Sequence, residues 1–272
     1  MAYMAYCGFS NNDQTLWPWL FGVIAVLFNP IFPIDMTKEI WMAVDFVTGG
    51  LFAYLAYEHY IQKNALNYDA DDLAFLGSCY ILGIRGLPQD DEKAVQYYRK
   101  AAEQGHVGAQ YFLGTHYSLK ATHAKLNGDS QDYDYEIASI WYRKAAEQGH
   151  VDAQYSLGNL YELGNGVSQD YNEAAVWYRK AAEQGYVDAQ YYLAALYKEG
   201  KGVPQDYEEA YFWSYQAEKY SLPDDNLIQT KAAQLRDIMA NELTSEQRSR
   251  AQKRSREWMS EKNDGSKGPD RN

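Results

Sequence analysis

A block of fifteen residues returns almost letter for letter 36 positions further along the chain. Trp141 to Tyr155 reads WYRKAAEQGHVDAQY, and Trp177 to Tyr191 reads WYRKAAEQGYVDAQY. A divergent copy, WSYQAEK, follows after another 36 residues, and YYRKAAEQG, which begins at Tyr97, precedes the first copy by 44. A unit that recurs in this way cannot bury its apolar face alone and must stack on copies of itself. The sequence therefore predicts a repeat array, whose role is binding rather than chemistry.

Each unit contains two helical segments separated by glycine turns. Ala153, Leu157 and Tyr161 are spaced four residues apart and so share one helical face. The next segment, GNGVSQDY at 164–171, offers glycines for left-handed turns and an aspartate to cap a second helix. That second helix ends in AAEQG, whose glycine supplies the turn into the next unit. We expect an all-α fold with four helix pairs between about Asp69 and Tyr220.

The recurring pattern A-x-x-x-LG-x-x-Y, then G-x-GV-x-QD-Y-x-x-A, then W-Y-x-x-AAEQG resembles the Sel1-like repeat (SLR) family, α/α relatives of tetratricopeptide repeats. The resemblance covers residues 65–222, a little over half of the chain. It implies an α/α solenoid that holds a protein partner, because members of the family act as scaffolds and adaptors. Two departures are visible: an insert at 118–134, expected to lengthen a helix and form a protruding loop, and an extra residue near Leu87.

Helix positions that differ between copies mark a candidate face for a partner. Residues that pack the array should recur, and residues that recognise a partner are free to change. The varying positions are Phe112, Thr115 and His116, which become Ser156, Asn159 and Leu160, and then Tyr192, Ala195 and Leu196. The candidate partner-binding residues are Phe112, Thr115, Tyr155, Ser156, Asn159, Tyr192 and Ala195. An exposed face without a ligand predicts the same variation, so that alternative stays open.

A search for catalytic, cofactor and metal motifs finds almost nothing. The sequence has no G-x-x-x-x-GK-[ST], H-E-x-x-H, paired C-x-x-C, G-x-S-x-G or S-x-x-K. His116 and His123 are seven residues apart, which does not suit a common zinc site. His106 and His150 share a repeat position with Tyr186, which indicates a packing or turn role. We expect no enzyme activity, no cofactor, no metal and no small-molecule substrate; an SLR hydrolase is the least favoured reading.

Charge is unevenly distributed along the chain. The net charge is −3 for residues 1–63, −10 for 64–222 and +1 for 223–272. An acidic array repels phosphate backbones, which disfavours nucleic acid, and it attracts a basic partner surface. A merely soluble surface would carry the same charge. Cys7 and Cys79 lie in different regions, so no disulfide framework is expected.

Residues 1–64 have a different composition from the repeats. The segment 16–34 has no charged residue, and 40–57 has only Asp45. Each is long enough to cross a hydrocarbon core of about 30 Å, and tryptophans and tyrosines gather near their ends. The pattern predicts a transmembrane hairpin over 16–57, with Asp45 in a structural or assembly role. An apolar cap on the first repeat remains an alternative, since three prolines interrupt the first segment.

The hairpin also resembles an uncharacterised class of small bacterial membrane domains, on the stretch LFNPIFP with Trp41 and Asp45. That class has an apolar helix before the hairpin, so we expect a natural start upstream of Met1. Lys38 between the spans is outweighed by Lys63 and Arg85 after them. The positive-inside rule therefore places the repeats in the cytoplasm, at the bacterial inner membrane.

After Tyr220 the repeat pattern fades, and residues 223–262 predict two capping helices. The second begins with TSEQ at Thr244, a capping box. A basic group then follows: Arg248, Arg250, Lys253, Arg254 and Arg256. It could contact anionic lipid or the acidic array, but a solvated helix face is the preferred interpretation. The tail 263–272 is expected to be disordered.

These observations favour a membrane-anchored scaffold or adaptor that binds a protein partner through an α/α solenoid. The alternative is an accessory or regulatory subunit of a membrane transport or channel assembly, in which the hairpin is the active element. The oligomeric state and the identity of the partner do not follow from the sequence.

Overall fold

The computed structural model describes residues 68–84, 87–127, 132–220 and 226–265. The chain divides into two compact units, Met1–Ile61 and Gln62–Asn272, and every described residue belongs to the second. The predicted hairpin at 16–57, with Asp45, therefore lies outside the described residues. Within those ranges, no helix has both the length and the apolar character that a bilayer span requires.

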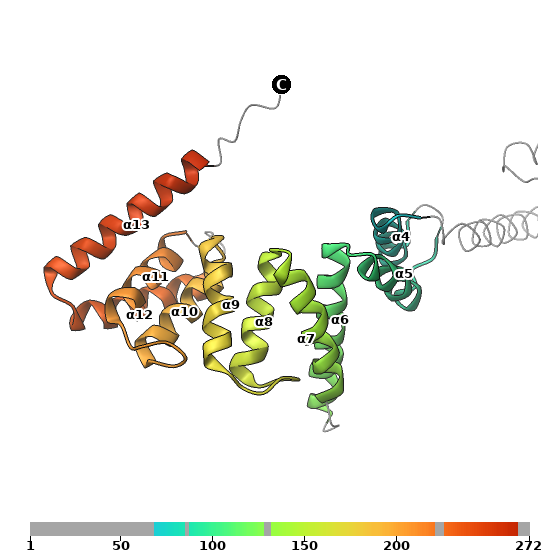
Figure 1. Ribbon diagram of the computed structural model, residues 1–272, viewed down its shortest axis with the longest axis horizontal. Helices are drawn as coiled ribbons and strands as arrows, with labels where there is room; N and C mark the ends of the chain where they lie inside the picture. The colour runs from blue at the N-terminus through green and yellow to red at the C-terminus, as the bar shows by residue number, and fades with distance from the viewer. Residues whose placement is uncertain (1–67, 85–86, 128–131, 221–225, 266–272) are drawn as a thin grey trace, which may run out of the picture. The chain divides into compact units, whose positions relative to one another are not determined.

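Ten α-helices, and no strand, make up the described part of the chain (Figure 1). Four pairs come first: α4 (Ala70–Leu82) with α5 (Asp91–Glu103), α6 (Val107–Leu126) with α7 (Asp132–Glu147), α8 (Val151–Leu163) with α9 (Tyr171–Glu183), and α10 (Val187–Glu199) with α11 (Tyr207–Tyr220). Then come α12 (Asn226–Glu242) and α13 (Ser245–Gly265). From α4 to α12 each helix packs on the next. The predicted all-α solenoid of four pairs is confirmed; below, the first helix of each pair is helix A and the second is helix B.

The turns have the predicted chemistry. Asp170 caps α9 by accepting the backbone N–H of Asn172 at 2.8 Å, and Asp206 caps α11 in the same way. These caps satisfy N–H groups that have no partner within the helix. Three A helices end at a glycine with positive φ: Gly83, Gly164 and Gly200.

The loop between helices A and B also contacts the unit before it. A Cβ atom on Gly166 would lie 2.2 Å from the backbone carbon of Tyr135, and one on Gly202 would lie 2.0 Å from the carbonyl oxygen of Tyr171. Both glycines have positive φ, at 64° and 68°. The loops of the third and fourth units therefore pack on the first turn of the preceding helix B, an approach that only glycine permits.

Within a pair, a tyrosine of helix B lies against a glycine of helix A. A Cβ atom on Gly158 would lie 2.7 Å from the ring of Tyr178, which is fully buried. The fourth pair has Ala194 and Ser214 at these positions, both fully buried. The larger residue on helix A is thus matched by a smaller one on helix B. The first two pairs repeat the glycine and tyrosine arrangement with Gly77 and Tyr98, and with Gly114 and Tyr142.

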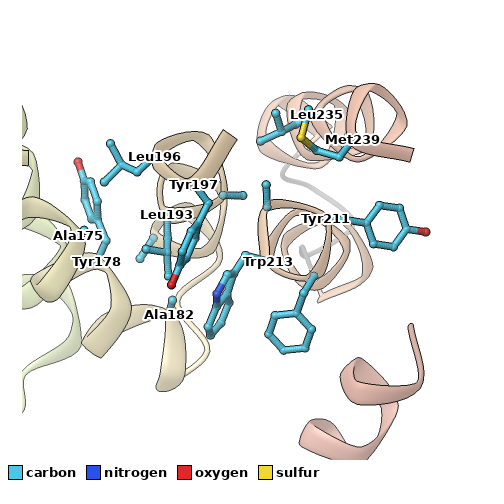
Figure 2. Close-up of a cluster of buried hydrophobic side chains, with 14 of the residues drawn as sticks. Ala175, Tyr178, Ala182, Leu193, Leu196, Tyr197, Tyr211, Trp213, Leu235 and Met239 are labelled. Atoms are coloured by element: carbon cyan, nitrogen blue, oxygen red, sulfur yellow. The ribbon is translucent and has the colours of Figure 1, made fainter. Parts of the chain in front are cut away.

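The larger buried cluster lies where α9, α10, α11 and α12 meet (Figure 2). Leu193 of α10, Trp213 of α11, and Leu235 and Met239 of α12 all belong to this cluster. Since α12 packs on both α10 and α11, it takes the place of a further helix A. It covers an apolar surface that the last repeat would otherwise expose.

The insert of the second unit lengthens helix A. α6 has 20 residues against 13 in α8 and α10, so the predicted lengthening is confirmed. α7 begins at Asp132, and the segment 128–131, where the expected protruding loop would lie, is outside the described residues. Lys120 of α6 binds Asp134 of α7 at 3.0 Å, and the hydroxyls of Thr122 and Tyr135 are hydrogen-bonded at 3.0 Å. Polar residues of the insert thus form pairs between these two helices.

The expected capping helices and capping box are present. The N–H of Gln247 donates to Thr244 Oγ1 at 3.3 Å, and the N–H of Thr244 donates to Gln247 Oε1 at 2.9 Å. α13 continues to Gly265, into the segment that we expected to be a disordered tail.

The solvated basic face predicted for α13 is wrong at two of its five cations. Arg250 forms a bidentate pair with Glu208 at 2.6 Å, and Arg254 binds Glu209. The sequence did not reveal this contact because α13 packs on α11, two helices earlier in the chain. Trp258 adds an apolar contact on the same side, against the ring of Phe212.

Candidate partner-binding surface

Two sets of contacts repeat at the junctions between helices. A helix B arginine donates to a tyrosine hydroxyl of the next helix A: Arg99 to Tyr117, Arg143 to Tyr161 and Arg179 to Tyr197. A glutamine after helix B donates to a buried glutamine of helix A, at 2.7 Å in both cases: Gln148 to Gln110 and Gln184 to Gln154. These contacts fix the register of the helices, so their residues are structural.

The varying helix A position lies over the tyrosine of the preceding helix B. Phe112 stacks on Tyr98 with 4.0 Å between ring centroids, and Tyr192 stacks on Tyr178 at 5.6 Å. Ser156 occupies the same position and is hydrogen-bonded to the hydroxyl of Tyr142. The structure thus brings three of the predicted residues to equivalent places on the helix A face.

The largest aromatic group on this face comprises Tyr155, Tyr178, Tyr186 and Tyr192, here called the tyrosine cluster. The ring of Tyr155 lies 5.8, 5.0 and 6.0 Å from the rings of the other three, in that order. Tyr178 is fully buried, and its hydroxyl donates to Glu162 Oε2 at 2.6 Å. The other three rings are partly exposed, so they can contact a partner.

The hydroxyl groups of the cluster are held in their neutral form. Burial raises the pKa of Tyr155 and Tyr178 well above the usual 10, and raises that of Tyr186 to about 12. Nearby carboxylates act in the same direction, Asp188 on Tyr155 and Asp152 on Tyr186. At neutral pH these tyrosines offer hydroxyl groups and ring faces, which suits binding rather than proton transfer.

The other predicted residues lie on the same helices. Thr115 Oγ1 accepts a hydrogen bond from the Tyr142 hydroxyl at 3.3 Å, and Asn159 and Ala195 are partly buried. Leu160 and Leu196 are each only 3 % exposed. The interpretation of the whole varying arc as free for a partner is therefore wrong at these two positions, because they pack in the core.

His106 and His150 have the predicted turn role. His106 Nδ1 accepts the N–H of Ala109 at 2.9 Å and so caps α6, and His150 caps α8. Tyr186, at the same position before α10, makes no such hydrogen bond, and its ring joins the cluster instead. In the described part of the chain, no group of three or more His, Cys, Asp or Glu side chains could hold a metal ion.

Sequence reasoning missed two of the four tyrosines in the cluster. Tyr178 lies in a block that recurs and was not singled out, and the position of Tyr186 was given only a packing or turn role. The alternation of glycine with alanine at 158 and 194, and of tyrosine with serine at 178 and 214, was the available signal. It indicates that helix B residue 178 lies directly against helix A.

Comparisons with known proteins agree with this architecture. A Sel1 repeat model matches residues 70–106, 107–150, 151–186 and 187–219, and residues 1–57 match a family of unknown function (DUF6804). The three internal boundaries fall at or beside the capping positions His106, His150 and Tyr186. No curated protein sequence matches the chain.

Two solved structures are similar to the chain. A protective antigen of uropathogenic Escherichia coli strains, which displays an SLR fold, has 33 % identity and a TM-score of 0.58 over 76 % of this chain and 41 % of that one. A Sel1 repeat protein from Oxalobacter formigenes has 28 % identity and a TM-score of 0.52, over 75 % of this chain and 85 % of that one. The chain thus spans less than half of the first relative. Four repeat matches that cover more than half of the sequence show that the chain belongs to the Sel1 repeat family.

Proposed function

We propose that the chain is a membrane-anchored adaptor that binds a protein partner on the helix A face of its Sel1 repeats. Sel1-repeat solenoids generally bind protein partners. One observation carries the assignment of the face: the arginine–tyrosine and glutamine contacts repeat from junction to junction, whereas the residue over each helix B tyrosine changes from Phe112 to Ser156 to Tyr192. The contacts that hold the helices together are thus the same at each junction, whereas the partly exposed residue changes.

The membrane anchor rests on the two apolar segments 16–34 and 40–57. Each has the length and apolar character of a transmembrane helix. With Lys63 and Arg85 following the second segment, the positive-inside rule places the repeats on the cytoplasmic side of a bacterial inner membrane. Fractionation of membranes, with protease protection of a tag at the C-terminus, tests both statements.

The partner face is tested by affinity purification of the detergent-solubilised full chain, with mass spectrometry of the bound proteins. The variant carries Phe112→Ser and Tyr192→Ser, since Ser156 shows that serine fits this position. Tyr155 is left intact because its ring contacts three others. Ile140→Ser on helix B is the matched control, since Ile140 is 52 % exposed. We expect a protein that is lost in the variant and retained in the control; an identical set in all three would exclude this face.

A second experiment separates the adaptor from a transport or channel subunit. Residues 62–272 form a compact unit of their own. If the chain is an adaptor, this unit should still bind the partner without residues 1–61. If the repeats only regulate a channel formed by the hairpin, removal of residues 1–61 should abolish the activity of the assembly.

A further inference from the structure

Most aromatic rings near a cation of this chain lie on helix B or at a junction between units. Four contacts show the pattern, with the cation over the ring at 4.2, 3.8, 5.5 and 5.6 Å: Lys144 over Trp141, Lys180 over Trp177, Arg143 over Tyr161 and Arg179 over Tyr197. The negative face of each ring is thereby matched by a positive charge. Cations of the array thus lie over several of its own rings.

The tyrosine cluster does not follow this pattern. Among the described residues, no lysine or arginine lies over the ring of Tyr155, Tyr178, Tyr186 or Tyr192. The charged groups near it are carboxylates instead. Glu162 accepts from Tyr178 at 2.6 Å, and Asp152 and Asp188 flank Tyr186. Ring faces and negative charge thus coincide at one partly exposed place on an array whose net charge is −10 over 64–222.

We propose that the tyrosine cluster binds a lysine or arginine side chain from a basic segment of the protein partner. The cation would lie over the partly exposed rings of Tyr155, Tyr186 and Tyr192, and the carboxylates of Asp152 and Asp188 would balance its charge. This inference rests on the proposed function, since it names the chemistry that the helix A face recognises. An apolar segment fits less well, because it would remove water from two carboxylates, which is unfavourable.

The repeats themselves show which residues can replace two tyrosines of the cluster without disturbing the fold. At the equivalent site one repeat earlier, the positions of Tyr186 and Tyr192 are occupied by His150 and Ser156. The double substitution Tyr186→His and Tyr192→Ser therefore gives the third site a residue set with which the repeat already folds. Ile140→Ser is the matched control, since Ile140 is 52 % exposed and belongs to helix B, outside the helix A face.

The test uses the full chain in detergent and an array of random dodecapeptides, with the double variant and the Ile140→Ser control in parallel. We expect peptides bound by the wild type to be enriched in lysine or arginine, and this enrichment to be lost in the double variant and kept in the control. For one selected peptide, fluorescence anisotropy should show an affinity about tenfold lower in the double variant, within the range of a desolvated cation–π contact. Asp152→Asn with Asp188→Asn should weaken binding and reduce its dependence on salt.

The outcomes distinguish the two proposals. Selected peptides without enrichment in basic residues would leave the proposed partner face in place and overturn the cation site. Equal enrichment in the wild type and the double variant would also overturn it, because the cation would then be bound elsewhere. If no variant, including the wild type, selects any peptide, both the partner face as a binder of peptide segments and the cation site fail together.

Discussion

The second and third units contain the same aromatic site with different polar chemistry. In the second, Tyr111 lies 5.9 Å from Tyr142 and 4.5 Å from the ring of His150. In the third, Tyr155 lies 5.8 Å from Tyr178 and 5.0 Å from Tyr186. The ring positions agree closely, although one site carries a histidine where the other carries a tyrosine.

The comparison shows that the residues that set the packing of a site are not the ones that change between sites. The close approach of a helix B tyrosine to a helix A glycine sets the geometry of both sites. The residue that caps the next helix A, and the residue one turn into it, set what the site presents to a partner. A repeat array can therefore change its specificity in one unit without disturbing its neighbours.

The largest effect is expected where the shared geometry is broken. Gly158→Ala would place a Cβ atom 2.7 Å from the buried ring of Tyr178 and should lower the free energy of unfolding by about 2 kcal/mol. Urea unfolding of residues 62–272, followed by tryptophan fluorescence, measures it. Addition of Tyr178→Ser, which copies the Ala194 and Ser214 pair, should cost less than the sum of the two single changes. Strict additivity would contradict the proposed packing relation.

At the repeated arginine contacts we expect a smaller loss of stability, and the same loss in both units. Arg143→Met and Arg179→Met each remove a hydrogen bond to a tyrosine, Tyr161 or Tyr197, and the cation over its ring. Each should reduce the free energy of unfolding by about 1 kcal/mol. The same urea experiment compares them directly. A clearly larger loss in one unit than in the other would show that the two junctions are not equivalent.

The third site should also respond to alkaline pH through Tyr186, a residue that the second site replaces by His150. The folded pKa of Tyr186, about 12, is above its ordinary value of 10, so the folded state holds this proton more tightly than the unfolded chain does. Its contribution to stability is complete below about pH 10 and is lost as the pH rises through about 12. The difference in tyrosinate absorbance between the wild type and Tyr186→Phe should therefore show a midpoint above 10. A midpoint at 10 or below would place Tyr186 in an ordinary solvent environment.

The smallest effect concerns the α6 end of the face. Burial, followed by the charge of Lys120, lowers the pKa of His116, while Asp134 and Asp91 oppose the change and Arg99 adds slightly to it. Lys120→Gln should therefore raise the His116 pKa, as measured by NMR titration of the imidazole protons. An unchanged pKa would mean that burial alone accounts for the shift.

The helix pairs, their caps and the lengthened α6 could be predicted from the sequence because each follows from local spacing. Ala153 and Leu157 repeat at helical intervals, and Asp170 stands directly before its helix. The contact between α13 and α11 could not be predicted, since Arg250 and Glu208 are 42 residues apart and nothing local joins them.

The candidate site was predicted only in part. Phe112, Ser156 and Tyr192 were found by comparing copies, since a position that varies in a repeat is visible without any structure. Leu160 was misplaced because a leucine can vary among other residues and still be buried. Tyr178 was missed because it recurs in the earlier copies, so the comparison of copies did not single it out, although its buried ring supports the exposed ones.

The glycine loops bear on how the array would come apart under load. α7 and α9 are each held at their first turn by the loop of the unit that follows, through Gly166 and Gly202. Each loop thus fastens one unit to the next. A force that pulls on the array should therefore be shared between these neighbouring units rather than borne by a single helix pair.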